Sequence, residues 1–377
     1  MMKKAIKKLL AALLAVAMVC AMAIPAFAYE SWETEEDLNK LHGYSAFQIF
    51  KGVISKDNPT LSGVDWGEHI IDHDEFLKQL RADTTIGRYF TNATSVPEVL
   101  AVISKWHDSD DDSIAFARFV CHYLYSNGAA PDSDIVSGNS SITIPEAGYY
   151  LIVDNIDFSN GDSYHAYNSF LLVNVPQAVQ TSYNVTINHK VVKPTVEKKV
   201  YDNFDNQDGT STGDFGSSAD HAINEKFQFQ LIAKLPAGRD EGRAYDYYDE
   251  YAVLFNDTLS NGITYDRLDS VVIESNGTTY DITGDSSKYT IDTTDLESHN
   301  YFVVGIPDVK TCVEDPRFNL NDGATITVTY TAHLNEKAAV NTEGGSTSNI
   351  NKVYLTYSNN PKDESSIGKT PESTPVY

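Results

Sequence analysis

The second half of the chain, from residue 191 onward, consists of short stretches in which apolar and polar residues alternate. The stretches are FQFQLIAKLP, YAVLFNDTLSNGITY, SVVIES, YTIDTT, YFVVGIP, ATITVTYTAHL and NKVYLTYS. A period of two indicates strands with one buried face, and the Gly, Asn, Asp and Pro clusters between the stretches indicate tight turns. We therefore predict that residues 191–361 form an immunoglobulin-like β-sandwich.

The first part of the chain mixes strand and helix patterns. GYSAFQIFKGVIS (43–55), SITIPEAGYYLIVDN and NSFLLVNVP alternate like strands. Between them lie the helical segments DEFLKQLRA, VPEVLAVISKW behind the capping box Ser95-Val96-Pro97-Glu98, and IAFARFVCHYLYSNG with its Asn-Gly stop. We expect residues 29–190 to form a β domain with a helical insertion, in a two-domain chain that is mainly β.

Both ends of the chain differ from the rest. Residues 1–28 combine a lysine-rich start, an apolar run and the cleavage pattern Ala26-Phe27-Ala28, which predicts a secretory signal peptide. A retained membrane anchor is the alternative, although the apolar run is short for a span. Residues 362–377 are polar and contain prolines, and we interpret them as a linker to a missing C-terminal part with a sorting signal. The two cysteines that would remain fall in different predicted domains, so we expect no disulfide.

The charge of the chain excludes several kinds of partner. With 53 acidic and 28 basic residues its net charge is −25, which is unfavourable for nucleic acid or an anionic membrane surface. The pair His69 and His73, and the acidic residues Asp202, Asp205 and Asp208, are weak matches to zinc and calcium patterns. We expect surface polar groups there, and we expect no metal, no cofactor and no small-molecule substrate.

Three polar side chains fall on apolar strand faces of the predicted sandwich. In PTVEKKVY, Lys198 faces the same side as Val196 and Val200. In the same way, Asp257 lies on an apolar face of VLFNDTL, and Asn351 on an apolar face of NKVYLTY. An amine, a carboxyl and a carboxamide are therefore expected in one interior.

Burial gives these three groups a specific chemistry. It lowers the pKa of a lysine toward the neutral, nucleophilic amine and raises the pKa of a carboxylic acid. Attack of Lys198 on the amide of Asn351, with Asp257 donating a proton to the amide carbonyl and accepting one from the amine, would expel ammonia and leave an isopeptide bond. The alternatives are a buried Lys–Asp ion pair beside a hydrogen-bonded Asn, or polar groups at strand ends that reach water.

Motifs spread over about residues 43–361 resemble those of sortase-assembled pilins of Gram-positive bacteria. They are FQIFKG, LSGVDWG, IPEAGYYLIVD, KPTVEKKV, FNDTLSNGITY and NKVYLTYSNNP. The second half resembles the fimbrial isopeptide-forming domain, which is related to the collagen-adhesin sandwich. This resemblance implies a bond between Lys198 and Asn351 with Asp257 as catalyst, in a protein of the cell wall. In the other crosslink box of the family, Y-x-L-x-E, Val153 replaces the glutamate, so we expect no crosslink of that type in the first domain, although a mechanism using Asp154 stays open.

The resemblance also implies a lysine that accepts the acyl group from a pilus sortase. Lys190 matches the lysine of the motif W-x-x-x-V-x-V-Y-P-K-N, although the Trp, Tyr, Pro and Asn of that motif are replaced here. Lys193 is the next candidate. We expect a structural, non-enzymatic pilus subunit that is joined to other pilin subunits. The alternative is a surface adhesin or minor pilin of similar fold that binds host protein or glycan.

Overall fold

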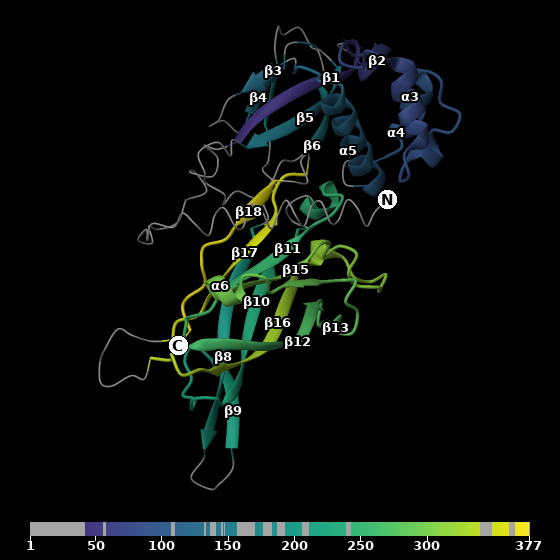
Figure 1. Cartoon of the computed structure of the whole chain (residues 1–377). Coiled ribbons are helices and arrows are strands. Elements are labelled where there is room, and N and C mark those ends of the chain that lie inside the picture. Colours follow the sequence, from purple (N-terminus) through teal and green to yellow (C-terminus); the bar gives the residue numbers. More distant parts are fainter. Residues whose placement is uncertain are drawn as a thin grey trace.

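The computed structural model describes residues 42–376 except 56–57, 107–109, 132, 136–140, 145, 147, 157–169, 176–182, 187–192, 206–210, 239–242, 340–348 and 362–365. Two parts lie end to end, a smaller N-terminal part with helices and a longer part made of strands (Figure 1). Each part has its own apolar core. The expected boundary at residue 190 lies outside the described residues.

The N-terminal part is built on an antiparallel sheet. Its strands, in spatial order, are β2 (Asn58–Trp66), β1 (His42–Ser55), β5 (Gly148–Ile156) and β6 (Phe170–Val175), with β3 (Ser133–Ile135) also pairing with β1. A separate pair joins β4 (Ser141–Ile144) to β7 (Tyr183–Thr186). The strands expected from alternation around residues 43–55 and in the segments ending near residues 155 and 176 are confirmed.

The expected helical insertion lies between β2 and β3. It consists of α3 (His73–Ala82), the short 3-10 helix η1 (Gly87–Tyr89), α4 (Val96–Ile103) and α5 (Asp111–Ser126). Glu98 accepts from the backbone N–H of Thr94 at 2.7 Å and from the Ser95 hydroxyl at 3.0 Å, but the Ser95 side chain makes no capping bond to the helix, so the predicted capping box is only half formed. Helix α5 ends at Ser126 with Asn127 as its C-cap, and Gly128 has a φ of +65°, as the Asn-Gly stop predicts.

The second part is a sandwich of two antiparallel sheets, as the alternation predicts. The six-stranded sheet has the order β13 (Thr278–Asp281), β12 (Ile263–Ser275), β16 (Ala324–Leu334), β10 (Lys226–Leu235), β8 (Thr195–Asp205) and β9 (Ser211–Gly216). The five-stranded sheet has the order β14 (Thr290–Asp292), β15 (Tyr301–Ile306), β11 (Val253–Thr258), β17 (Lys352–Ser358) and β18 (Ile367–Lys369). Short helices η2 (Ala244–Tyr247), α6 (Leu296–His299) and η3 (Leu320–Asp322) connect strands.

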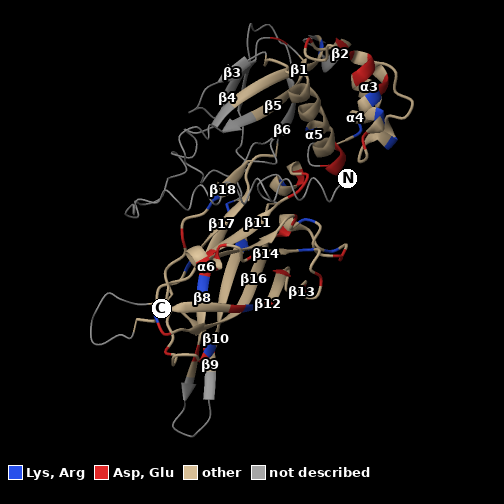
Figure 2. Ribbon diagram, viewed as in Figure 1, with Lys and Arg blue, Asp and Glu red and all other residues tan. Residues whose placement is uncertain are grey.

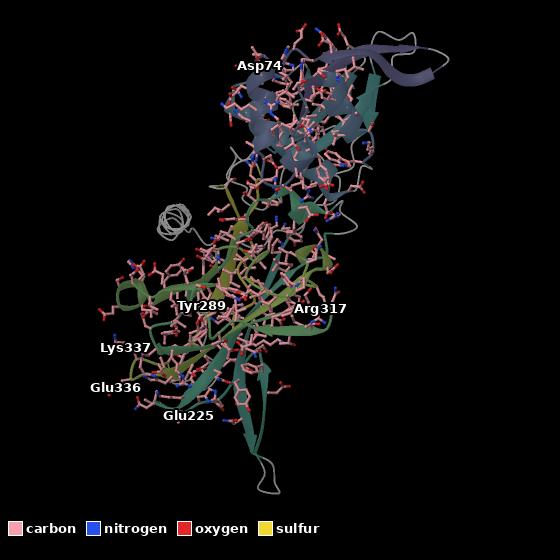
Figure 3. All side chains as sticks on the ribbon, turned by 90° about the vertical axis from the view of Figure 1, so that its right-hand side faces the viewer. Asp74, Glu225, Tyr289, Arg317, Glu336 and Lys337 are labelled. Atoms are coloured by element: carbon pink, nitrogen blue, oxygen red, sulfur yellow. The ribbon has the colours of Figure 1, made fainter. Side chains whose placement is uncertain are left out.

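Side chains pack throughout both parts, and charged residues such as Asp74, Glu225 and Arg317 lie at the outside (Figure 3). The two cysteines of the described region, Cys121 and Cys312, are buried and free. Among the residues described, no helix is both long and apolar enough to cross a bilayer.

The C-terminal residues correct one sequence-based interpretation. Residues after 361 were expected to form a linker, but Ile367–Lys369 is strand β18 and pairs with β17. Further along, Ser373 N donates to Val353 O at 2.7 Å, and Val376 forms a bridge with Asn351. Val376 is 1% exposed and belongs to the sandwich core. The polar composition of this segment suggested a linker. The segment is nevertheless part of the sandwich, because backbone groups and small hydroxyl side chains hold it there.

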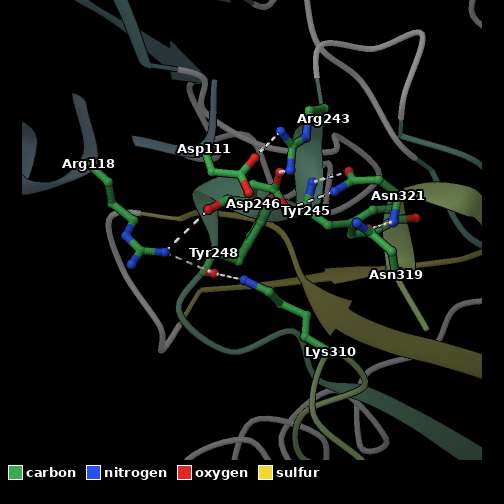
Figure 4. Close-up of polar contacts among 9 residues, drawn as sticks. All are labelled: Asp111, Arg118, Arg243, Tyr245, Asp246, Tyr248, Lys310, Asn319 and Asn321. Atoms are coloured by element: carbon green, nitrogen blue, oxygen red, sulfur yellow. Dashed lines mark hydrogen bonds and ion pairs between the residues drawn. The ribbon is translucent and has the colours of Figure 1, made fainter. Parts of the chain in front are cut away.

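The two parts meet where helix α5 lies against η2 (Figure 4). Arg118 on α5 donates to the backbone carbonyls of Asp246 and Tyr248 at 3.2 and 3.5 Å. Asp111, in the acidic first turn of α5 (red in Figure 2), pairs with Arg243. Tyr247 belongs to the apolar core of the N-terminal part. The contact between the parts is therefore partly ionic and partly apolar.

Candidate functional site

The three polar residues singled out by strand alternation all lie in the interior of the sandwich. Lys198 comes from β8 of the six-stranded sheet, and Asp257 from β11 of the five-stranded sheet. Asn351 directly precedes β17, the neighbour of β11. Lys198 is 4% exposed, and the other two are fully buried. The site therefore joins the two sheets across the core.

The amine of Lys198 is in direct contact with the carboxyl of Asp257. Lys198 Nζ donates to Asp257 Oδ1 at 2.6 Å and to Oδ2 at 2.5 Å. Both distances are shorter than usual for a hydrogen bond between charged groups, and neither side chain is exposed to solvent. One amine and one carboxyl are thus in direct contact in an interior without solvent.

Burial moves the pKa values of this pair toward the neutral forms. Desolvation lowers the pKa of Lys198 to about 8, although the nearby Asp257 opposes the shift. Desolvation likewise raises the pKa of Asp257, against the opposing effects of Lys198 and a hydrogen bond from Tyr330. Both shifts favour a neutral amine beside a protonated acid, the state in which lysine is a nucleophile.

The amide of Asn351 is linked to this pair through Tyr330 on β16. Asn351 Nδ2 donates to the Tyr330 hydroxyl at 2.8 Å, and that hydroxyl is also hydrogen-bonded to Asp257. The expected hydrogen bond from Asp257 to the Asn351 carbonyl is absent among the described residues, and both carboxyl oxygens accept from Lys198. Asn351 Oδ1 is buried and has no hydrogen-bond partner in the part of the chain that the structure describes.

Aromatic rings enclose the site. Lys198 Nζ lies 5.1 Å from the centroid of the Phe229 ring and 5.4 Å from that of Tyr330. Phe302 packs edge-on against Tyr330, with ring centroids 5.1 Å apart. These rings exclude water, which accounts for the size of the desolvation effect on both ionisable groups.

The C-terminal segment fixes the backbone of Asn351. Asn351 N donates to Val376 O at 3.1 Å, and Val376 N donates to Asn351 O at 3.2 Å. Val353, two residues further along β17, is fixed by Ser373 through both its N–H and its carbonyl. The residue that carries the amide is therefore anchored by backbone bonds.

Tyr330 is the site residue that sequence reasoning missed. In ATITVTYTAHL, strand alternation puts Tyr330 on the same inward face as Ala324, Ile326 and Val328. That pattern predicts burial of the ring. A buried tyrosine hydroxyl needs a hydrogen-bond partner, so the search for polar groups on apolar faces could have included it.

The other predicted site residues lie elsewhere. Lys190 is outside the described residues, and its role as sortase acceptor stays a prediction. Lys193 is half-buried, and Lys199 is half-buried and pairs with Glu197 at 3.6 Å. In the N-terminal part, Val153 is fully buried on β5.

The residues of the weak metal patterns lie as follows, except Asp208, which is outside the described residues. His73 stacks on Trp66, and His69 packs edge-on against Phe47. Asp202 and Asp205 lie within strand β8 and not in a loop. Across the described part of the chain, no group of three or more His, Cys, Asp or Glu side chains could hold a metal ion.

Comparison with known proteins gives structural neighbours only. No family model and no curated protein matches the chain. Similar solved structures include the full-length major pilin SpaD of Corynebacterium diphtheriae, with 16% identity, a TM-score of 0.35, and coverage of 61% of this chain and 47% of SpaD. The major pilin BcpA of Bacillus cereus shows 12% identity and a TM-score of 0.34, over 61% of this chain and 54% of BcpA.

The T6 backbone pilin of Streptococcus pyogenes matches over a longer stretch. It is 15% identical with a TM-score of 0.44, and the match covers 89% of this chain and 59% of that pilin. The chain spans about half of the length of these pilins. These low identities and TM-scores say nothing about chemistry, which is argued from the buried side chains alone.

Proposed function

We propose that this chain is a structural subunit of a covalently assembled cell-surface pilus, stabilised by an isopeptide bond between Lys198 and Asn351. The observation that carries the proposal is the enclosed contact between Lys198 and Asp257, with Asn351 linked to it through one hydroxyl. The secretory signal pattern and the pilin-like motifs of the sequence support export and a surface role. In this proposal the two parts of the chain are successive domains of the shaft.

An ordinary buried ion pair explains the site less well. Such a pair is often no more stable than apolar residues of the same size, because desolvation offsets the attraction of the charges. A fully buried amine whose pKa is lowered to about 8 is instead suited to attack an amide. The product would contain no buried charge at Lys198, so the condensation removes the unfavourable feature of the site.

In the proposed reaction, the neutral amine of Lys198 attacks the side-chain carbonyl carbon of Asn351. Asp257, protonated at the start, supplies one proton to the amide and takes one from the attacking nitrogen, so the amide nitrogen leaves as ammonia. The bond would join β8 of the six-stranded sheet to the residue directly before β17 of the five-stranded sheet. A covalent link across the sandwich resists separation of the two sheets, which suits a subunit that carries tension along a fibre.

Assembly into a pilus is tested by sortase labelling. The mature chain, starting at Tyr29, is incubated with a pilus sortase and a peptide that carries a sorting signal. We expect the label on Lys190, lost in Lys190→Arg and retained in the matched control Lys193→Arg. Attachment at Lys193 or Lys199 would show that the acceptor is misplaced. No attachment, under conditions that label a standard pilin, would favour the adhesin interpretation.

A further inference from the structure

The proposed condensation needs a proton at the amide nitrogen. The nitrogen of Asn351 leaves as ammonia only after it gains a proton, because an amide anion is a very poor leaving group. Asp257 is the acid of the site, but both of its oxygens accept from Lys198 and no contact joins it to Asn351 among the described residues. The proton therefore has to pass through another group.

Tyr330 is the group in contact with the leaving nitrogen. Its hydroxyl oxygen lies 2.8 Å from Asn351 Nδ2 and is also hydrogen-bonded to Asp257. The ring is fully buried and packs between Phe229 and Phe302, so the hydroxyl has a fixed position. The carbonyl oxygen of Asn351 has no donor in the described part of the chain, so the assistance that the site offers is on the nitrogen side of the amide.

We propose that Tyr330 is a catalytic residue that relays a proton from the Asp257 carboxyl to the leaving nitrogen of Asn351. This inference rests on the crosslinking reaction proposed above and adds a group to it. In the resting site Asn351 Nδ2 donates to the hydroxyl and the hydroxyl donates to Asp257. Attack by Lys198 makes Nδ2 tetrahedral and basic, so both bonds reverse. The hydroxyl can accept from one partner while it donates to another, and it ends the reaction in its original state.

The proton balance closes without any further reactant. Lys198 Nζ forms a bond to Asn351 Cγ, and the carbonyl electron pair moves to Oδ1. The Asp257 acid gives its proton to the Tyr330 oxygen, while the Tyr330 proton moves to Nδ2. The Asp257 carboxylate then takes a proton from Nζ. The pair on Oδ1 re-forms the carbonyl, the bond from Cγ to Nδ2 breaks, and ammonia departs.

The test compares crosslinking rates in the full chain. Wild type, Tyr330→Phe and the control Tyr265→Phe are made by cell-free synthesis, and the peptide that joins Lys198 to Asn351 is quantified over time by mass spectrometry. Tyr265 packs against Tyr330 with ring centroids 5.7 Å apart but does not touch the amide. We expect Tyr330→Phe to crosslink about 10²-fold more slowly and Tyr265→Phe at nearly the wild-type rate.

A second arm keeps the shape of the side chain. Replacing Tyr330 by 3,5-difluorotyrosine changes the acidity of the hydroxyl, so the rate and its solvent isotope effect should change. A purely structural hydroxyl would leave both unaltered. If Tyr330→Phe does not fold, this arm decides alone.

The outcomes separate the two proposals. A folded wild type that never crosslinks refutes the proposed reaction itself. A wild type that crosslinks, with Tyr330→Phe equally fast or with a rate indifferent to hydroxyl acidity, overturns the relay alone.

Discussion

The two cores of this molecule bury polar groups in different ways. In the N-terminal part, the buried polar side chains described are Ser45 and Gln48, and Gln48 Nε2 donates to the Tyr150 hydroxyl at 3.1 Å. Both partners of that bond are neutral. In the sandwich, an amine and a carboxyl that are both inaccessible to solvent lie 2.5 Å apart.

The difference indicates which polar groups serve folding alone. A neutral hydrogen bond in a core contributes about 1 kcal/mol and satisfies both partners. A buried ionisable pair carries a desolvation penalty that its own attraction does not reliably offset. The polar contact of the N-terminal core is explained by packing, whereas that of the sandwich calls for a chemical role.

The largest expected effect is the loss of the crosslink in Asn351→Ala. The bond would close a loop of more than 150 residues, which in the chain-entropy model stabilises by about 5 kcal/mol. The sandwich should therefore melt about 10 to 20 °C lower, as measured by calorimetry, and become sensitive to protease. An unchanged melting temperature would mean that no such bond stabilises the fold.

A second variant removes the charged pair from the sandwich core. In the Asn351→Ala background, Lys198→Met combined with Asp257→Leu replaces the charged pair by apolar side chains of similar size. Because the crosslink is already absent, we expect unfolding in denaturant to show a gain of about 1 to 4 kcal/mol over Asn351→Ala alone. A clear loss would show that the pair stabilises the fold by itself, which contradicts a chemical role.

The pH dependence of the same two variants isolates the buried lysine. The pKa of Lys198 falls from 10.5 to about 8 on folding, so between these values the unfolded chain binds more protons. The free energy of unfolding of Asn351→Ala should therefore rise as pH increases from about 8 to 10.5. The raised pKa of Asp257 acts oppositely on the acidic side, where stability falls as pH rises above 3.8. Both trends should be missing from the apolar variant, and their presence there would assign them to other groups.

The smallest effect is expected from a tyrosine substitution in the N-terminal core. Tyr150→Phe removes a hydroxyl that accepts from Gln48 and donates to the carbonyl of Glu146 at 3.1 Å. We expect a loss of about 1 kcal/mol in denaturant unfolding and no change in the extent of crosslinking. Reduced crosslinking in this variant would show that the two parts do not act independently.

Strand alternation predicted much of this architecture. It placed Lys198 and Asp257 on inward faces, because one side of each strand must meet the opposite sheet. It failed for β11 as a whole, since Leu254 and Asn256 on the other face are buried too.

Strand alternation could not predict which side chains of opposite sheets touch each other. The hydroxyl of Tyr330 meets Asn351 only because β16 and β17 come from opposite sheets, a pairing that no local periodicity contains. The packing of the last residues on β17 was missed for a related reason. That segment is held by backbone hydrogen bonds to Val353 and Asn351, and Val376 is its one buried apolar residue among those described, so its sequence shows no apolar pattern.

The central claim is tested most directly by the intact mass of the purified chain from Tyr29. We predict a mass lower than that of the sequence by one ammonia, and digestion should yield a peptide in which Lys198 is joined to Asn351. Asp257→Ala should restore the full mass while the sandwich stays folded by circular dichroism. A well-folded wild-type chain with the unmodified mass would contradict the account.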